Sequence, residues 1–177
     1  LAKQLHLISF DHRGSGRSAQ PRGPAPYHID HFVDDIAALA RALDLQRFAL
    51  LGHSFGGIVG LHFALSHPDL LTHLILVCAP TSHHYVEDVE AAIPDRLDDA
   101  ALSELSSFQD SPPSDHIMRR SLELLAPIYF RDPASLQDLD LDSVRFGPET
   151  QAVWDSLEGF DLRPRLDIDL EVRLADL

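Results

Sequence analysis

Cysteine, basic residues and long apolar runs are scarce in this sequence. A single cysteine, Cys78, excludes an internal disulfide and fits a reducing compartment, so we expect a cytoplasmic protein. No apolar run is long enough to span a bilayer and no basic leader precedes one, so we expect neither a membrane span nor a secretory signal. The 28 acidic residues outnumber the 14 basic ones, and the net charge of −14 argues against nucleic acid and anionic membranes as partners.

The length and the ends of the chain set further limits. A chain of 177 residues is long enough to bury a real core, and one domain is the default. The sequence begins with Leu1 and contains one methionine, Met118, so we expect that it is part of a longer polypeptide. Cys78 lies in the apolar run 74–79, where we predict a buried strand and a small core thiol.

The stretch 48–57, FALLGHSFGG, is central to our interpretation of the chain. A short apolar run leads into a Gly-x-Ser-x-Gly turn, and an apolar helix is predicted to follow. This arrangement would hold Ser54 on a sharp strand-to-helix turn, as a nucleophile requires. The N–H of Phe55 and the positive end of the helix would then stabilise an oxyanion. We expect a side chain at Gly52 or Gly56 to collide with the neighbouring strand or helix.

Two simpler explanations compete for the same motif. Gly-x-Ser-x-Gly is short enough to occur by chance, and the strand and helix patterns on either side are what argue against a chance match. Ser54 could also serve only as the N-cap of the helix. That role explains a serine but not the glycines at 52 and 56, so we favour the nucleophile.

Strand and helix patterns alternate through the first half of the chain. Apolar runs predict strands at 5–10, 48–51 and 74–78, and periodic apolar residues predict helices at 30–43 and 55–67. Asp30 is the predicted N-cap of the first helix, and His67-Pro68 ends the second. This rhythm predicts an α/β fold with a parallel sheet that helices cover on both faces.

The segment 11–18, DHRGSGRS, superficially fits a dinucleotide-binding turn, because Gly14, Gly16 and Ala19 match G-x-G-x-x-A. Such a turn needs a helix to start at once. Three prolines follow within residues 21–26 instead, so we predict an extended loop and no dinucleotide cofactor. No HExxH or cysteine–histidine zinc spacing occurs either, and we expect no metal or other cofactor.

The second half is acidic, rich in helix patterns and broken by prolines. We predict a partial core at 1–82, a helical cap or lid at 83–160 and a return to the core at 161–177. The clearest helix patterns of the cap lie at 101–105 and 116–125. A helical excursion between strands commonly covers the edge of the sheet where ligands bind.

The loop at 11–18, the motif at 52–57 and the His-Pro pair before the third strand together resemble the α/β-hydrolase family. The loop, Asp-x-Arg-Gly-x-Gly-x-Ser, is most similar to the proline iminopeptidase branch. The resemblance implies the α/β-hydrolase fold with a serine nucleophile at Ser54. It also implies an oxyanion hole that uses the Phe55 N–H, and a helical cap inserted after the third strand.

The same resemblance implies which residues border the pocket. The loop would do so with Asp11, Arg13 and Gly14, and we expect its Asp and Arg side chains to brace the loop rather than to react. His53 adjoins the nucleophile and would also border the pocket, although we expect its side chain to point elsewhere.

In this family the general-base histidine and its carboxylate partner follow the cap, and the second oxyanion donor precedes the strand at 5–10. The chain therefore resembles the middle of a hydrolase, and a serine without a base is a poor nucleophile. Of its 11 histidines, His12, His83 and His84 fall nearest the predicted pocket. We expect each of them to lie at the rim or on the surface.

Three functions stay open at this point. The first is an aminopeptidase that releases N-terminal proline-like residues through a Ser54 acyl-enzyme. A substrate ammonium would need an acidic partner in the lid, and six glutamates are candidates: Glu87, Glu90, Glu104, Glu123, Glu149 and Glu158. The second is a carboxylesterase or lactonase with the same nucleophile, and the third is an inert truncated product. The expected partner is a small-molecule or short-peptide substrate; the sequence sets no oligomeric state.

Overall fold

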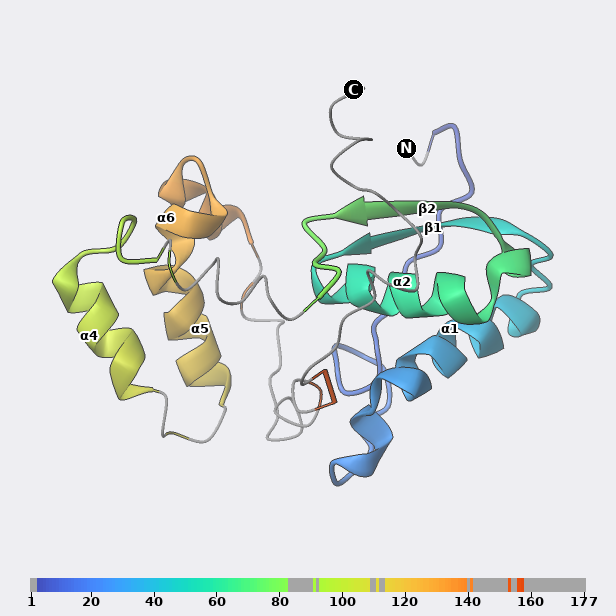
Figure 1. Cartoon of the computed structure of the whole chain (residues 1–177), viewed down its shortest axis with the longest axis horizontal. Coiled ribbons are helices and arrows are strands. Elements are labelled where there is room, and N and C mark those ends of the chain that lie inside the picture. The colour runs from blue at the N-terminus through green and yellow to red at the C-terminus, as the bar shows by residue number, and fades with distance from the viewer. Residues whose placement is uncertain are drawn as a thin grey trace. The chain divides into compact units, whose positions relative to one another are not determined.

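The computed structural model describes residues 3–82, 91, 93–108, 111, 114–139, 141, 153, 156 and 157 (Figure 1). The chain divides into two compact units. One comprises Leu1–His28 with Glu90–Ser156, and the other comprises Ile29–Val89 with Leu157–Leu177. The predicted boundaries after residues 82 and 160 adjoin segments outside the described residues, so they stay predictions.

The second unit contains a two-stranded parallel sheet. Its elements follow one another as α1 (Ile29–Ala42), β1 (Phe48–His53), α2 (Phe55–Ser66), η2 (Pro68–Leu70) and β2 (Leu71–Val77). β1 pairs with β2 in a register that places Leu50 opposite Leu74 and His53 opposite Val77. A parallel pair requires a crossover connection, and α2 supplies it. The strands predicted at 48–51 and 74–78 and both predicted helices of this unit are confirmed.

α2 is apolar around its whole circumference because it is enclosed on two sides. It contacts both strands, and α1 packs against it. The largest fully buried side chains come from these two helices: Phe32, Ile58, Val59, Leu61 and Phe63. The ring of Phe63 also lies 5.9 Å from that of Phe48 on β1. The core of this unit is therefore centred on α2, which carries the predicted motif at its first turn.

The predicted cap of α1 needs a small correction. α1 begins at Ile29, so Asp30 lies in its first turn instead of at the N-cap. A carboxylate there still interacts favourably with the positive end of the helix. α1 ends at Ala42, and Asp44 adopts a left-handed conformation with φ 53° in the turn toward β1.

The sheet is covered on one face only in the part of the chain that the structure describes. Figure 1 shows α1 and α2 on the same side of the strands. Apolar side chains on the other face are exposed, with Leu51 at 55%, Ile75 at 46% and Val77 at 39%. The prediction of two covered faces is thus not met by the described residues.

The prediction of a strand at residues 5–10 is wrong. Residues 6–12 form no strand, and Leu5, Leu7, Ile8 and Phe10 are exposed. A strand is stabilised by the hydrogen-bonded ladder to a neighbour and by burial of alternate side chains. The apolar pattern is present in this segment, but no ladder is formed with another described residue.

The first unit carries η1 (Ala25–Tyr27) near its start and, among the described residues, the helices of the second half. These are α4 (Asp99–Ser107), α5 (Asp115–Leu124), α6 (Ala126–Tyr129) and η3 (Pro133–Asp138). The helices predicted at 101–105 and 116–125 are confirmed as α4 and α5. Both begin with a side-chain cap, because Asp98 accepts the Ala101 N–H at 2.8 Å and Ser114 accepts the Ile117 N–H at 3.3 Å.

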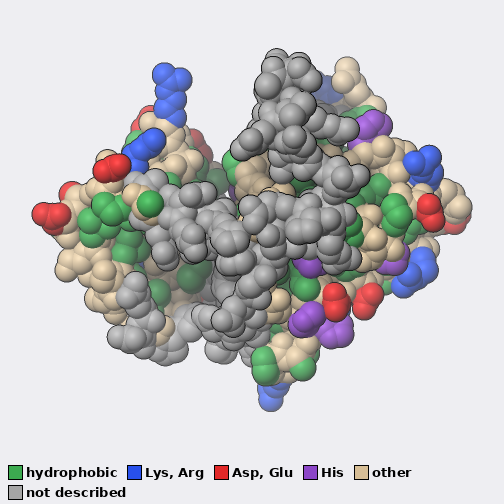
Figure 2. All heavy atoms as spheres, in the orientation of Figure 1, with side chains coloured by type: hydrophobic (Ala, Val, Ile, Leu, Met, Phe, Trp, Pro, Cys, Tyr) green, Lys and Arg blue, Asp and Glu red, His purple; other side chains and the backbone are tan. Residues whose placement is uncertain are grey.

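Arg120 on α5 connects α4 to α5 through charged hydrogen bonds. Its guanidinium donates to both carboxylate oxygens of Glu104 on α4, at 2.7 and 2.9 Å, and to Glu123 on its own helix at 2.9 Å. The hydrogen bonds from Arg120 hold the pKa of the Glu104 carboxyl below its usual value. On the visible face of the molecule, acidic and basic side chains are interspersed (Figure 2).

Truncation of the central aromatic residue of α2 should destabilise the chain strongly. Phe63→Ala removes a side chain that is 0% exposed, so we expect a loss of about 3–5 kcal/mol in unfolding free energy. Urea unfolding followed by circular dichroism measures it. The matched control is Tyr129→Ala, because Tyr129 is 64% exposed and its removal should change stability by less than about 0.5 kcal/mol. Equal effects of the two truncations would contradict this description of the core.

Neutralising Glu104 should weaken the α4–α5 pair in a pH-dependent way. Because its folded-state pKa is lowered, its contribution is present at neutral pH and is lost as the pH falls through that lowered value. Glu104→Gln should therefore lower the thermal midpoint at pH 7, and the difference from the wild type should vanish in strong acid. Asp138→Asn is the control, since Asp138 is exposed at the end of η3. A difference that persists unchanged in acid would count against the ion pair.

Candidate active site

The strand-to-helix turn at Ser54 has the strained geometry that the motif predicts. β1 ends at His53 and α2 begins at Phe55, so one residue makes the whole reversal. Ser54 adopts φ 51° and ψ −120°, a conformation that residues other than glycine rarely occupy. Its N–H donates to the Val77 carbonyl at 2.9 Å, which extends the β1–β2 ladder up to the turn. Ser54 is exposed at the carboxyl end of β1.

The alternative that Ser54 is only a helix N-cap is not supported by the geometry. A capping serine accepts a backbone N–H of the first helical turn with its side-chain oxygen. The Ser54 hydroxyl makes no such bond. The N–H groups of Gly57 and Ile58 bond instead to the backbone carbonyl of Ser54, at 2.9 and 3.2 Å. The hydroxyl is therefore not used to begin the helix.

Phe55 is the first residue of α2, and packing fixes its position. Its ring lies 5.2 Å from that of Phe32 on α1, in an edge-to-face arrangement. In the first turn of an α-helix the N–H groups have no acceptor four residues earlier within the helix. The Phe55 N–H thus belongs to the end of α2 that carries partial positive charge, next to the Ser54 side chain.

The glycines of the motif have different roles, and one expectation is wrong. A Cβ on Gly52 would collide with the backbone of Gly56 and lie 2.7 Å from the Gly57 Cα, so the prediction for Gly52 is confirmed. A Cβ on Gly56 would meet nothing within 4 Å, so the collision predicted there does not occur. The crowded position is Gly57, where a Cβ would collide with the Cβ of Ala79. The double glycine in the sequence was the available signal for this contact.

His53 is exposed and lies on the face of the sheet away from α2. Successive side chains of a strand alternate between faces. Gly52 is buried toward α2, so His53 shares the opposite face with Leu51. This agrees with the expectation that the His53 side chain points elsewhere. His83 and His84 fall outside the described residues.

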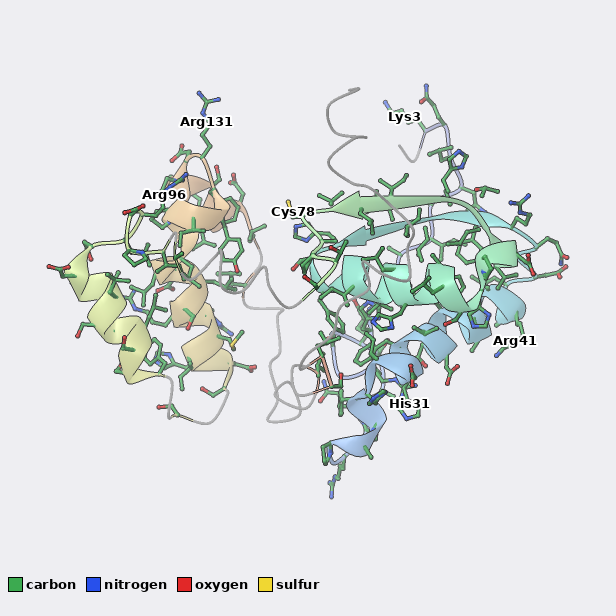
Figure 3. All side chains as sticks on the ribbon, viewed as in Figure 1. Lys3, His31, Arg41, Cys78, Arg96 and Arg131 are labelled. Atoms are coloured by element: carbon green, nitrogen blue, oxygen red, sulfur yellow. The ribbon has the colours of Figure 1, made fainter. Side chains whose placement is uncertain are left out.

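The prediction that Cys78 is a buried strand residue is wrong. β2 ends at Val77, and Cys78 is an exposed free cysteine with φ 48° instead of a buried strand residue. Figure 3 shows its side chain at the tip of β2. Because the Ser54 N–H bonds the Val77 carbonyl, Cys78 adjoins the turn. The apolar run that surrounds it in the sequence does not reveal where the strand ends.

The loop 11–18, in the other unit, is held by its own polar groups. The Asp11 carboxylate accepts the Arg17 N–H at 3.0 Å, and the Ser18 hydroxyl donates to the Asp11 carbonyl at 2.6 Å. Arg13 donates to the Pro26 carbonyl at 2.9 Å. Gly14 has φ 77°, and a Cβ there would collide with the Tyr27 ring. Asp11 and Arg13 thus brace the loop, as expected, while its place beside a pocket stays a prediction.

Two of the six candidate ammonium ligands are described, and both are already paired. Glu104 and Glu123 accept hydrogen bonds from Arg120, which also raise the pKa of that guanidinium. A substrate ammonium would have to share these carboxylates with a fixed cation. The other four, Glu87, Glu90, Glu149 and Glu158, lie outside the described residues.

Among the residues that the structure places, no three histidine, cysteine or acidic side chains gather into a possible metal site. Within the same residues, no helix is long and apolar enough to cross a membrane.

Known proteins resemble the chain in sequence and in fold. It is 42% identical over 82 residues to "Putative carbamate hydrolase RutD" of Pseudomonas syringae pv. syringae (strain B728a), a match that covers 46% of this chain and 31% of that protein. A hydrolase of the α/β fold family from Bacillus anthracis str. Sterne aligns with a TM-score of 0.62 at 20% identity, over 88% of this chain and 58% of the other. Proline iminopeptidase from Mycobacterium smegmatis aligns with a TM-score of 0.60 at 20% identity, over 88% and 57%.

Because their sequence identity to the chain is only 20%, the similar solved structures support the fold alone. The chain covers less than a third of the length of that curated relative. The sequence model of the α/β hydrolase fold matches residues 1–112, which is more than half of the chain and includes the loop, the turn at Ser54 and both strands. Together with the parallel strands and the strained serine between β1 and α2, this match shows that the chain belongs to the α/β hydrolase family.

Proposed function

We propose that this chain carries the nucleophile of a serine hydrolase, with Ser54 as the attacking residue. The observation that supports the proposal is the geometry of Ser54. Its hydroxyl takes no part in capping α2, yet its backbone holds an unfavourable conformation of φ 51° and ψ −120°. Backbone strain of this kind costs about 1–3 kcal/mol and is concentrated at functional sites. A serine with a purely structural role gives no reason for such a cost.

The proposed reaction uses these groups in the following order. Ser54 Oγ attacks the carbonyl carbon of an ester or amide, and its proton passes to a general base. The carbonyl oxygen becomes an oxyanion, which the Phe55 N–H stabilises together with the positive end of α2. The intermediate collapses with loss of an alcohol or amine, and water then hydrolyses the acyl-Ser54. The Ser54 hydroxyl makes no capping hydrogen bond, and the general base is a separate part of the proposal.

The narrower proposal is an aminopeptidase that removes N-terminal proline-like residues. It is supported by the Asp-x-Arg-Gly-x-Gly-x-Ser loop at 11–18. The pairing of Glu104 and Glu123 with Arg120 counts against these two acids as ligands for the substrate ammonium. The ammonium site of the proposed aminopeptidase therefore uses other acids.

Carbamate hydrolysis is a second candidate, favoured by a specific observation. The relative named "Putative carbamate hydrolase RutD" is 42% identical over 82 residues, whereas the proline iminopeptidase structure is 20% identical. Ser54 would attack the carbamate carbonyl as it attacks an ester. A carbamate without an N-terminal ammonium needs no acidic ligand in the cap, which fits the internal pairing of the α4–α5 glutamates.

Replacing the nucleophile should abolish reaction while leaving the fold intact. The protein is expressed with its natural flanking coding sequence, and a fluorophosphonate probe is followed by mass spectrometry. We expect labelling at Ser54, no labelling of Ser54→Ala, and a fall in ester hydrolysis of about 10³-fold or more. Ser66→Ala, at the other end of α2, is the control and should react like the wild type. Labelling at another serine, or equal activity of Ser54→Ala, would exclude Ser54 as the nucleophile.

The same protein separates the two narrower functions. Release of arylamine from a proline arylamide supports the aminopeptidase, and release of ammonia from a small carbamate supports the second candidate. Hydrolysis of simple esters alone would contradict both while leaving the serine hydrolase in place.

The two elbow glycines should respond differently to the same substitution. Gly52→Ala places a methyl group against the backbone of Gly56, so we expect loss of stability of about 1–3 kcal/mol and loss of labelling. Gly56→Ala points into open space and should fold at least as stably as the wild type. Chemical unfolding and probe labelling of both variants measure this difference. A tolerated Gly52→Ala would mean that β1 and α2 approach less closely than described.

A further inference from the structure

We propose that Ala79 is a positioning residue for the oxyanion donor, acting through Gly57. This inference rests on the proposed function of Ser54. It concerns the contact that holds the first turn of α2 in place. Ala79 follows β2 by two residues, whereas Gly57 lies in the first turn of α2. The two residues meet so closely that a Cβ on Gly57 would collide with the Cβ of Ala79.

The segment Val77–Ala79 contacts the turn at two points. At the first, the Val77 carbonyl accepts the Ser54 N–H at 2.9 Å. At the second, the Ala79 methyl group occupies the space that a Cβ on Gly57 would need, and the Gly57 N–H bonds the Ser54 carbonyl at 2.9 Å. Cys78 lies between them with φ 48°, and this left-handed residue makes the turn that leads from β2 to the contact of Ala79 with α2.

These two contacts fix different degrees of freedom. The hydrogen bond fixes the position of Ser54 beside β2, and it involves no residue of α2 itself. The Ala79–Gly57 contact sets how close the first turn of α2 comes to the end of β2. The Phe55 N–H belongs to that turn, so the contact also sets the location of the proposed oxyanion donor. Displacements of about 1 Å in such groups can cost roughly 100-fold in rate.

The contact depends on the small size of Gly57 and Ala79. Non-bonded carbon atoms approach to about 3.5–4.0 Å, so a methyl group on Gly57 must push α2 away from Ala79. If Ala79 is changed to glycine, the next neighbours of that new methyl group are the Gly52 carbonyl oxygen at 3.3 Å and the Ala79 Cα at 3.5 Å. The methyl group can then be accommodated with little movement, so the pair should be exchangeable between the two positions.

Gly60 provides a matched control on the same helix. A Cβ there would lie 3.2 Å from Leu74 Cδ1 and 3.7 Å from Leu50 Cδ2, which are the ends of flexible side chains. Gly60→Ala therefore brings the same gain in helix propensity as Gly57→Ala, about 1 kcal/mol. Unlike Gly57→Ala, it places the new methyl group beside side chains that can move. It separates the effect of alanine in α2 from the effect of the contact with Ala79.

The test compares the wild type with Gly57→Ala, Ala79→Gly, the double variant and Gly60→Ala, each with the natural flanking coding sequence. The readout is the second-order rate of fluorophosphonate labelling of Ser54, with unfolding measured in parallel. We expect Gly57→Ala to lower the labelling rate about 10- to 100-fold while it still folds, and to lower kcat for an ester more than it raises KM. The double variant should regain most of the lost rate, and Gly60→Ala should match the wild type.

Two outcomes would overturn the inference. One is a Gly57→Ala protein that labels at the wild-type rate, and the other is a double variant that stays as slow as Gly57→Ala. If the wild type itself is not labelled, the proposed function fails, and the inference is judged by the amide resonance of Phe55. That resonance should shift in Gly57→Ala and return in the double variant; an unmoved resonance in Gly57→Ala would refute the positioning role.

Discussion

The close approach of α2 to the carboxyl end of β1 is the constraint on which the rest of this structure depends. Only glycine at position 52 lets the first turn of the helix lie against the strand, because any Cβ there would overlap the Gly56 backbone. That proximity forces the reversal into one residue, and Ser54 accepts the strained torsion angles. Exposure of Ser54 at the carboxyl end of β1 follows from the same crossing.

Several contacts oppose the relaxation of this turn. The Val77 carbonyl holds the Ser54 N–H, two amides of α2 hold the Ser54 carbonyl, and the Phe55 ring rests on Phe32. Each contributes about as much as an ordinary hydrogen bond or aromatic pair, roughly 0.5–1.5 kcal/mol. Their sum is comparable to the strain of one unfavourable residue, and a buried helix supports all of them.

Local patterns in the sequence predicted the parts of the fold that depend on neighbouring residues. The amphipathic repeat of α1, the apolar α2 and the glycine-flanked serine were all identified correctly, and so were the helices α4 and α5 in outline. The segment 5–10 shows where such patterns fail, because a strand depends on a partner that its own residues do not specify. The same reason explains Gly57, whose role depends on Ala79 some twenty residues later.

The exposed thiol at the tip of β2 has a practical consequence. Cys78 is the only cysteine in the sequence, and it adjoins the turn that carries Ser54. A fluorophore or spin label attached by alkylation would therefore occupy one known position, two bonds of backbone away from the Val77 carbonyl that holds the turn. Changes in its signal on addition of a ligand would report occupancy near the serine without any turnover.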